Sequence, residues 1–207
     1  MKRTIIAISR QHGAGGTEIA QLLSARLSIP CYERTVIELA AEKTGFSPSY
    51  IEGLEESSSR SFLFNLVSGS YTPASLYPRY DVPVSLPALT AQASVIRELA
   101  QKGSCIIVGR CAEYILREDP DVVPVFLRAD KADRISFVMK DEGLEDRKAA
   151  ESRLVKTDRG RMNYYRSYTG EEWGAMENHD LSINTSRTGI SGAVDVIVSY
   201  LHALGRL

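Results

Sequence analysis

Short apolar runs alternate along this chain with longer stretches in which apolar residues recur every three or four positions. Five runs are short and bounded by polar positions, which predicts buried strands at residues 4–8, 30–32, 104–108, 122–127 and 181–183. Strands that alternate with helices favour a parallel sheet covered by helices on both faces. The pattern therefore predicts an α/β fold.

Helical spacing of apolar residues accounts for most of the chain between these strands. A helix over residues 190–201 has the clearest apolar stripe, and a further helix is expected to start at Ser47-Pro48, because proline favours the first helical position. From about residue 57 to 87 the periodicity is lost, and serine, proline and tyrosine dominate. We interpret this stretch as a mobile, partly helical insertion.

Composition restricts the number of domains, the kinds of partner and the cellular compartment that the sequence allows. A length of 207 residues, with 43% hydrophobic residues, is sufficient for one domain with a sizeable core. The net charge of −1 gives no general affinity for nucleic acid or for an anionic membrane, and no apolar stretch reaches the length of a membrane span. The three cysteines form no CxxC pair, which favours reduced thiols and a cytoplasmic protein.

The first expected strand runs into the sequence GAGGT at residues 13–17. A strand, a glycine-rich turn and a helix form an anion site, because amides at the helix start point outward and glycine allows a phosphate to approach closely. In the phosphate-binding pattern G-x-x-x-x-G-K-[ST], Arg10 stands at the first glycine and Gly16 at the lysine, while the second glycine and the threonine are in place. Two interpretations stay open, a phosphate-binding loop and a tight turn.

Two further features involve basic residues, a basic segment and a single arginine. Residues 147–166 hold seven basic side chains against two acidic ones, which is typical either of a solvated helix face or of a surface that closes over a polyphosphate. Arg110 follows an expected strand, at the sheet edge where ligands of α/β proteins bind. Its guanidinium suits bidentate capture of a phosphate, and the alternative is a salt bridge at that edge.

Four other segments carry a resemblance. Residues 103–112 resemble the strand and Gly-Arg element of cytidylate kinases, and residues 125–130 with Arg134 look like the strand and helix that lead into their lid. Residues 158–161 lie where that lid carries an aspartate and arginines, and residues 180–185 are similar to the last strand. Together with the glycine loop, the order resembles the cytidylate kinase-like family, a branch of the P-loop nucleoside monophosphate kinases.

The resemblance implies a P-loop NTPase-type three-layer sandwich with a helical lid. It implies one domain over residues 1–207, with a core at 1–56 and 88–207, an acceptor insertion at about 57–87 and a lid at about 143–168. The implied reaction is transfer of the ATP γ-phosphate to a nucleoside monophosphate such as CMP or dCMP, with Mg²⁺ as cofactor. Nucleotides are the expected partners, nucleic acid and membranes are not, and the oligomeric state stays open.

Roles for individual residues follow from the resemblance and the loop pattern. The Thr17 hydroxyl is the candidate magnesium ligand, and a helix N-cap is the alternative role for the same residue. The phosphate-binding residues are expected to be Gly13, Ala14, Gly15, Gly16 and Thr17.

The charged residues are assigned in the same way. Arg10, with arginines of the lid, is expected to replace the missing lysine. Asp158 is expected either to orient the lid arginines or to reach a water on the metal. Aromatic residues of the lid are expected to pack against the core rather than to stack a base. The expected catalytic residues are Arg10, Asp158, Arg159 and Arg161, the acceptor-binding residues are Arg34 and Arg110, and the lid-supporting residues are Arg134 and Arg153.

Two rival functions remain at this point. One is a nucleotide-binding or regulatory protein on the same fold that does not transfer phosphate, since a fold does not fix a function. The other is a kinase for a different small phosphate acceptor.

Overall fold

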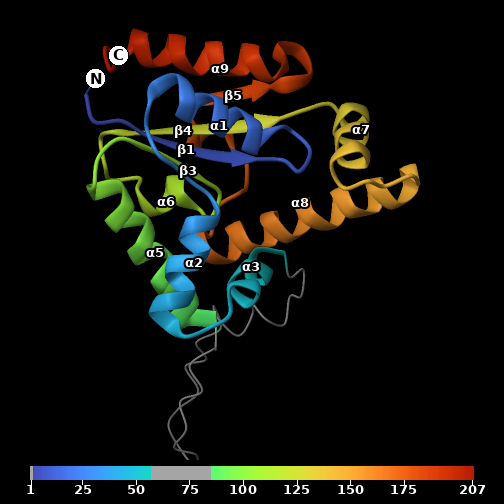
Figure 1. The fold of residues 1–207 in the computed structure, drawn as a ribbon, viewed down its shortest axis with the longest axis horizontal. Coiled ribbons are helices and arrows are strands. Elements are labelled where there is room, and N and C mark those ends of the chain that lie inside the picture. Colours follow the sequence, from blue (N-terminus) through green and yellow to red (C-terminus); the bar gives the residue numbers. More distant parts are fainter. Residues whose placement is uncertain (1, 57–84) are drawn as a thin grey trace, which may run out of the picture.

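A computed structural model describes residues 2–56 and 85–207 of the chain (Figure 1). Its centre is a parallel sheet of five strands in the order β2-β3-β1-β4-β5. The strands are β1 (Ile5–Arg10), β2 (Cys31–Tyr32), β3 (Cys105–Val108), β4 (Val122–Arg128) and β5 (Leu181–Asn184).

Helices connect the strands, as expected for parallel neighbours. They are α1 (Gly16–Leu27), α2 (Arg34–Thr44), α3 (Pro48–Glu56), α5 (Ser85–Gln101), α6 (Ala112–Ile115), α7 (Lys131–Asp141), α8 (Arg147–Thr169) and α9 (Thr185–Ala203), with a 3₁₀ turn η1 at Met176–Asn178. None of these described helices is long and apolar enough to cross a membrane.

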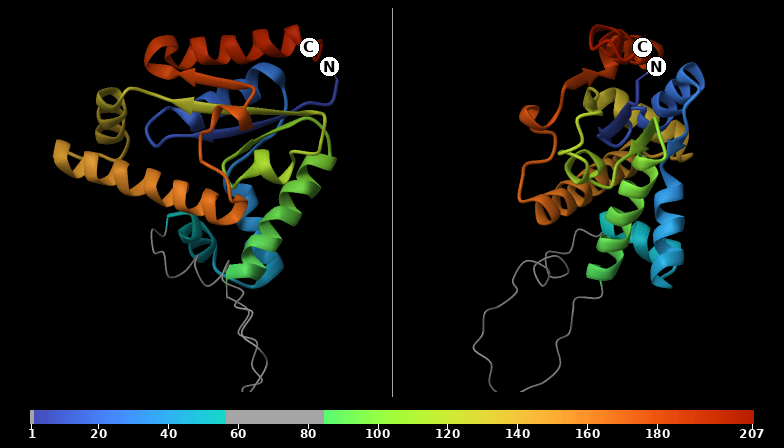
Figure 2. Two further views of the ribbon diagram at one scale, coloured as in Figure 1. Left: turned by 180° about the vertical axis from the view of Figure 1, so that it is seen from behind. Right: turned by 90° about the vertical axis from the view of Figure 1, so that its left-hand side faces the viewer.

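The two faces of the sheet bury separate cores, because side chains alternate along each strand. Ile6 and Ile8 of β1 pack with α1 and α9, whereas Ile5 and Ala7 pack with α2, α3, α5 and α6. Figure 2 shows these two helical layers from further directions. The predicted α/β three-layer architecture is confirmed.

Helices α7 and α8 form a pair beside the carboxyl edge of the sheet. A small core of Ile135, Val138, Ala150 and Leu154 joins them. The far half of α8 reaches back under the sheet (Figure 1). Its Tyr164 and Tyr165 are buried in the same core as Cys105 and Ile107 of β3. These two rings pack against the core, as the sequence indicated, and the basic segment forms one helix.

The predicted strands and helices correspond to elements of the structure. Ser47 precedes α3 and its hydroxyl accepts the Tyr50 amide at 3.2 Å, so the predicted helix start is confirmed. Most of the predicted insertion at 57–87 lies outside the described residues; its last three residues belong to α5.

Candidate functional site

The carboxyl edge of the sheet brings together the ends of three adjacent strands. β1 ends at Arg10, β2 is followed by Glu33, and β3 is followed by Gly109 and Arg110. Ligands of open α/β sheets bind at this edge. The charged residues of the site therefore come from segments distant in sequence that the sheet order places side by side.

The glycine loop joins β1 to α1 at the same edge. Gly13 has a φ of +75°, and a Cβ there would lie 2.8 Å from the backbone oxygen of Arg134, so both conformation and space require glycine. Gly15 is the N-cap of α1, and no side chain caps the first amides of the helix. Uncapped amides at a helix N-terminus are free to bind an anion.

The Arg10 side chain occupies the space that the lysine of the standard pattern would need. A Cβ on Gly16 would lie 2.7 Å from Cγ of Arg10, and a Cβ on Gly109 would overlap its guanidinium. The two glycines thus form a slot through which Arg10 crosses from the loop to β3. The Arg10 side chain can supply the positive charge of the missing lysine, and it also leaves no room for a side chain at position 16.

Glu33 joins the guanidinium of Arg10 to the hydroxyl of Thr17. Its carboxylate lies 3.3 Å from Nη2 of Arg10 and accepts a 3.1 Å hydrogen bond from the Thr17 hydroxyl. Thr17 lies inside α1, and Gly15 holds the cap position, so the alternative role of Thr17 as a helix N-cap is wrong. A hydroxyl and a carboxylate at this spacing fit Mg²⁺, which uses oxygen ligands and completes its shell with phosphates and water. Among the described residues, no group of three or more acidic, histidine or cysteine side chains forms a closed metal site.

Three guanidinium groups converge on one buried carboxylate. Glu55, near the end of α3, lies 3.3 Å from Arg110, 3.6 Å from Arg10 and 3.8 Å from Arg161. Burial opposes ionisation of Glu55, but the arginines outweigh it and lower its pKa to about 2. Burial and the neighbouring Arg10 lower the pKa of Arg161 to about 10.

Arg110 is held in an unusual backbone conformation. Its φ is +58°, and that of the next residue, Cys111, is +55°. Two consecutive residues other than glycine in the left-handed region cost free energy and are found mostly at functional sites. The sequence left two roles open for Arg110, capture of a phosphate and a salt bridge at the sheet edge. In the structure Arg110 forms a salt bridge with Glu55, which belongs to α3 and lines the α3 side of the site.

Asp158 ties α8 to the loop and to α7. Its carboxylate accepts hydrogen bonds from the His12 amide at 2.8 Å and from the buried Arg134 at 2.5 Å. These bonds join Asp158 to the loop and to α7, and its charge also acts on Arg161. Its expected role, to orient the lid arginines or to reach a water on the metal, stays a prediction. Arg161, by contrast, donates to the Arg10 carbonyl at 3.1 Å, which anchors α8 directly to the end of β1.

Two cavities meet at these residues. One, of about 400 Å³, opens over the glycine loop and reaches Phe137 and Asp141 of α7. The other, of about 310 Å³, lies between α2, α3 and β3 and contains Glu52, Glu55 and Arg110. Both cavities share the side chains of Arg10, Thr17, Glu33 and Arg161. We call them the loop cavity and the α3 cavity.

The remaining predicted residues contribute less to the two cavities. Ala14 is buried and its amide bonds within the loop to the Gln11 carbonyl, so this amide is not available to a phosphate. Arg34 is exposed at the rim of the α3 cavity and pairs with Glu38. Arg159 is exposed and lines neither cavity, and Arg153 contacts Glu142.

Sequence reasoning missed Glu55, and it included Gly109 in the Gly-Arg element without assigning it a role. Glu55 is one of two consecutive glutamates at the end of a helix, and no pattern distinguishes it from a solvated residue. Gly109 had a signal, because a glycine between a buried strand and an arginine indicates a close approach of another group.

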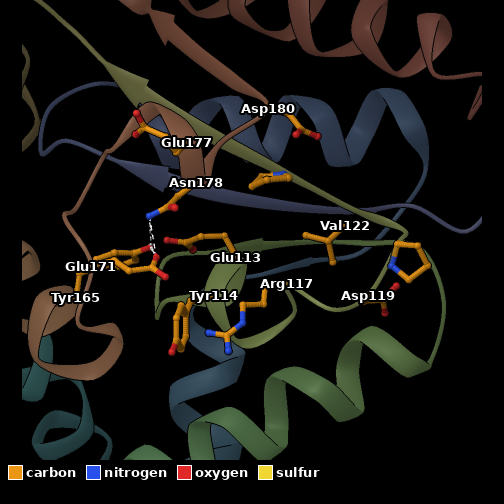
Figure 3. Close-up of a pocket in the computed structure, with 12 residues that line it drawn as sticks. Glu113, Tyr114, Arg117, Asp119, Val122, Tyr165, Glu171, Glu177, Asn178 and Asp180 are labelled. Carbon is orange, nitrogen blue, oxygen red and sulfur yellow. Dashed lines mark hydrogen bonds between the residues drawn. The ribbon is translucent and has the colours of Figure 1, made fainter.

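A third cavity, of about 380 Å³, lies away from the loop and borders η1, α6 and the start of β4 (Figure 3). It contains Glu113, whose buried carboxylate accepts the Ser9 hydroxyl at 2.8 Å. Burial raises the pKa of Glu113 to about 7. None of the residues expected to bind phosphate lines this cavity.

Comparison with solved structures identifies relatives of the whole fold. A protein of unknown function from Eubacterium ventriosum ATCC 27560 is 26% identical, with a TM-score of 0.71 over 97% of this chain and 99% of that one. Shikimate kinase from Bacteroides thetaiotaomicron (11% identity, TM-score 0.56, 97% and 99% covered) and a gluconokinase from Sinorhizobium meliloti 1021 (12%, 0.52, 98% and 97%) share the fold.

Comparison of sequences gives the family. No protein of curated function shows significant sequence similarity to the chain. The sequence pattern of the cytidylate kinase-like family matches residues 5–187, which include the loop, the α3 cavity and helix α8. The family supports phosphoryl transfer as the class of chemistry, and the two kinase structures show the shared fold alone. The chain belongs to the cytidylate kinase-like family.

Proposed function

We propose that the chain transfers the γ-phosphoryl group of ATP to a small phosphate-bearing acceptor, with CMP or dCMP as the first candidates. One observation carries the proposal: the loop cavity and the α3 cavity meet at Arg10, Thr17, Glu33 and Arg161. A donor in one and an acceptor in the other would face each other across these four side chains. Phosphoryl transfer depends on such positioning and on positive charge more than on covalent chemistry.

The residues of the chain supply both requirements. The amides at the start of α1 bind the donor phosphates, and Arg10 brings the charge that a loop lysine otherwise supplies. Arg161 adds a second guanidinium from α8, at the boundary between the cavities. Thr17 and Glu33 offer oxygens to Mg²⁺, which neutralises phosphate charge when it is bound. Arg110 holds the acceptor phosphate.

A second acceptor class has support of its own. Of the ten described residues that line the α3 cavity, seven are arginine or glutamate and none is aromatic. Nucleobases are commonly held by stacking on rings. A compact acceptor, such as a phosphorylated sugar, is therefore the second candidate.

The test is an ADP-release assay with ATP, Mg²⁺ and a panel of CMP, dCMP, UMP, AMP, GMP and sugar phosphates, with thermal unfolding of the same mixtures. Arg10→Ala and Arg161→Ala are run beside Arg166→Ala, which removes an exposed arginine of α8 that lines neither cavity. Turnover that falls in the first two variants alone supports the proposal. Stabilisation by ATP without turnover of any acceptor would favour a binding protein, and the absence of both signals would contradict the proposal.

A further inference from the structure

Glu55 is unusual because it places a negatively charged side chain in the cavity that we propose binds the acceptor phosphate. Its side chain is 10% exposed, carries a negative charge, and forms part of the wall of the α3 cavity between Arg110, Arg10 and Arg161. In the proposed function Arg110 binds the acceptor phosphate, and Arg161 lies beside it at the boundary between the cavities. In the structure as described, the carboxylate of Glu55 takes the place of that anion.

The contacts of Glu55 are loose for such a charged cluster. Its three guanidinium partners lie at 3.3–3.8 Å, whereas a charge-assisted hydrogen bond usually measures about 2.7–2.9 Å. Arg134 and Asp158, in the same molecule, approach to 2.5 Å. Glu55 thus balances the charge of the arginines without saturating their hydrogen-bond donors, of which each guanidinium has five.

A phosphate group is a better partner for this cluster. Three arginines face one carboxylate, so positive charge remains in excess at Glu55, although Glu33 offsets part of it at Arg10 and Asp158 offsets part of it at Arg161. A phosphate monoester brings up to two negative charges and three oxygens that can each accept from more than one guanidinium. A neutral hydroxyl compound brings no charge and cannot replace the carboxylate.

We propose that Glu55 is an internal anion that determines acceptor specificity: the acceptor's phosphate displaces it from Arg110 and Arg161, and acceptors without such a dianion are excluded. The inference rests on the proposed function in placing the acceptor in the α3 cavity. It makes Glu55 a competitor of the substrate phosphate.

Inorganic phosphate tests this competition without requiring turnover. Its binding is measured by titration calorimetry and by thermal unfolding, at constant ionic strength, for the natural chain, Glu55→Gln and Glu52→Gln. Glu52 lies one turn earlier on α3 and also lines the α3 cavity, but it is exposed and has no ion pair with Arg10, Arg110 or Arg161. Its variant therefore reports the loss of a negative charge in the same cavity that does not contact the arginines. We expect Glu55→Gln to bind phosphate about 10-fold more tightly, which corresponds to about 1.4 kcal/mol, and Glu52→Gln to change affinity less than threefold.

One further variant and one comparison of ligands test whether the result is specific to this cavity. Arg110 lines the α3 cavity but not the loop cavity, so the tighter binding must disappear in Glu55→Gln/Arg110→Ala. CMP should gain affinity in Glu55→Gln to the same extent as phosphate, whereas cytidine should gain none. If Glu55→Gln is less stable than the natural chain, phosphate should still raise its unfolding temperature by more than it raises that of the natural chain.

Three results would overturn the inference: equal or weaker phosphate binding in Glu55→Gln, tighter binding that persists without Arg110, and no binding to either protein. Failure of the proposed function has a different signature, because a protein that never releases ADP can still show the competition between phosphate and Glu55.

Discussion

The Cγ atom of Arg10 lies 2.7 Å from the position that a Cβ on Gly16 would take. This relationship explains why the loop lacks its lysine, because any side chain at position 16 would collide with the stem of Arg10. Arg10 then passes Gly109 and ends beside Glu33 and Glu55. The positive charge has therefore moved from the last part of the loop to its first residue, where it faces both cavities.

The first prediction concerns this exchange of positions. Gly16→Lys alone should lower the unfolding temperature and ATP-dependent turnover, because the new side chain and Arg10 compete for one space. Arg10→Gly/Gly16→Lys restores the standard pattern and should recover at least part of both. Thermal unfolding and ADP release are measured for the natural chain and for both variants. A Gly16→Lys single variant that is stable and more active would contradict the steric argument.

Arginines on α8 provide a second prediction. Arg161 lines both cavities and bonds to the Arg10 carbonyl, whereas Arg159, two residues earlier, is exposed. Arg161→Ala should lower kcat/KM by about 100-fold, the size usual for loss of one charged group that stabilises a transition state. Arg159→Ala should lower it by at least tenfold less. Equal losses would mean that α8 turns or moves when nucleotide binds.

The architecture could be predicted from the sequence because it depends on periodicity. Each strand is a short apolar run between helical stretches, and a parallel sheet buries both of its faces. The loop was found for a similar reason, because its glycines and the flanking strand and helix are contiguous in the chain.

The arrangement of the site could not be predicted in the same way. Glu55 meets Arg110 and Arg161 across separations in sequence of 55 and 106 residues, and the contact depends on the packing of α3 against α8. Asp158 was placed in the lid through the resemblance and lies on α8, but the sequence did not indicate that its side chain faces Arg134. Side-chain direction on a long helix depends on which face is buried, and α8 has a weakly defined apolar face.

A third prediction tests the anchor of α8. Asp158→Ala leaves the buried guanidinium of Arg134 without its carboxylate, and the His12 amide without an acceptor. Removal of one partner of a buried pair is strongly destabilising, and we expect a loss of about 3 kcal/mol in the free energy of unfolding. Glu145→Ala, which removes an exposed carboxylate before α8, should cost less than about 0.5 kcal/mol. Urea denaturation measures both, and equal stability of the two variants would refute the anchor.

The last prediction concerns pH and the buried Glu113. Burial raises the pKa of this carboxyl in the folded state to about 7, above its ordinary value of 4.5. An acid with a raised pKa binds its proton more tightly when folded, so its effect on stability becomes unfavourable as pH rises from about 4.5 to 7 and is constant above that. Glu113→Gln keeps an oxygen for the Ser9 hydroxyl and removes the charge.

This variant should match the natural chain at pH 4.5 and exceed its unfolding free energy by about 3 kcal/mol at pH 8.5, since one pKa unit corresponds to about 1.4 kcal/mol. Glu118→Gln, at an exposed position nearby, is the matched control for the loss of one negative charge. Urea denaturation across this range measures the difference. A constant gap between Glu113→Gln and the natural chain would show that the carboxyl titrates alike in the folded and unfolded states, and that its burial beside Ser9 does not hold the proton.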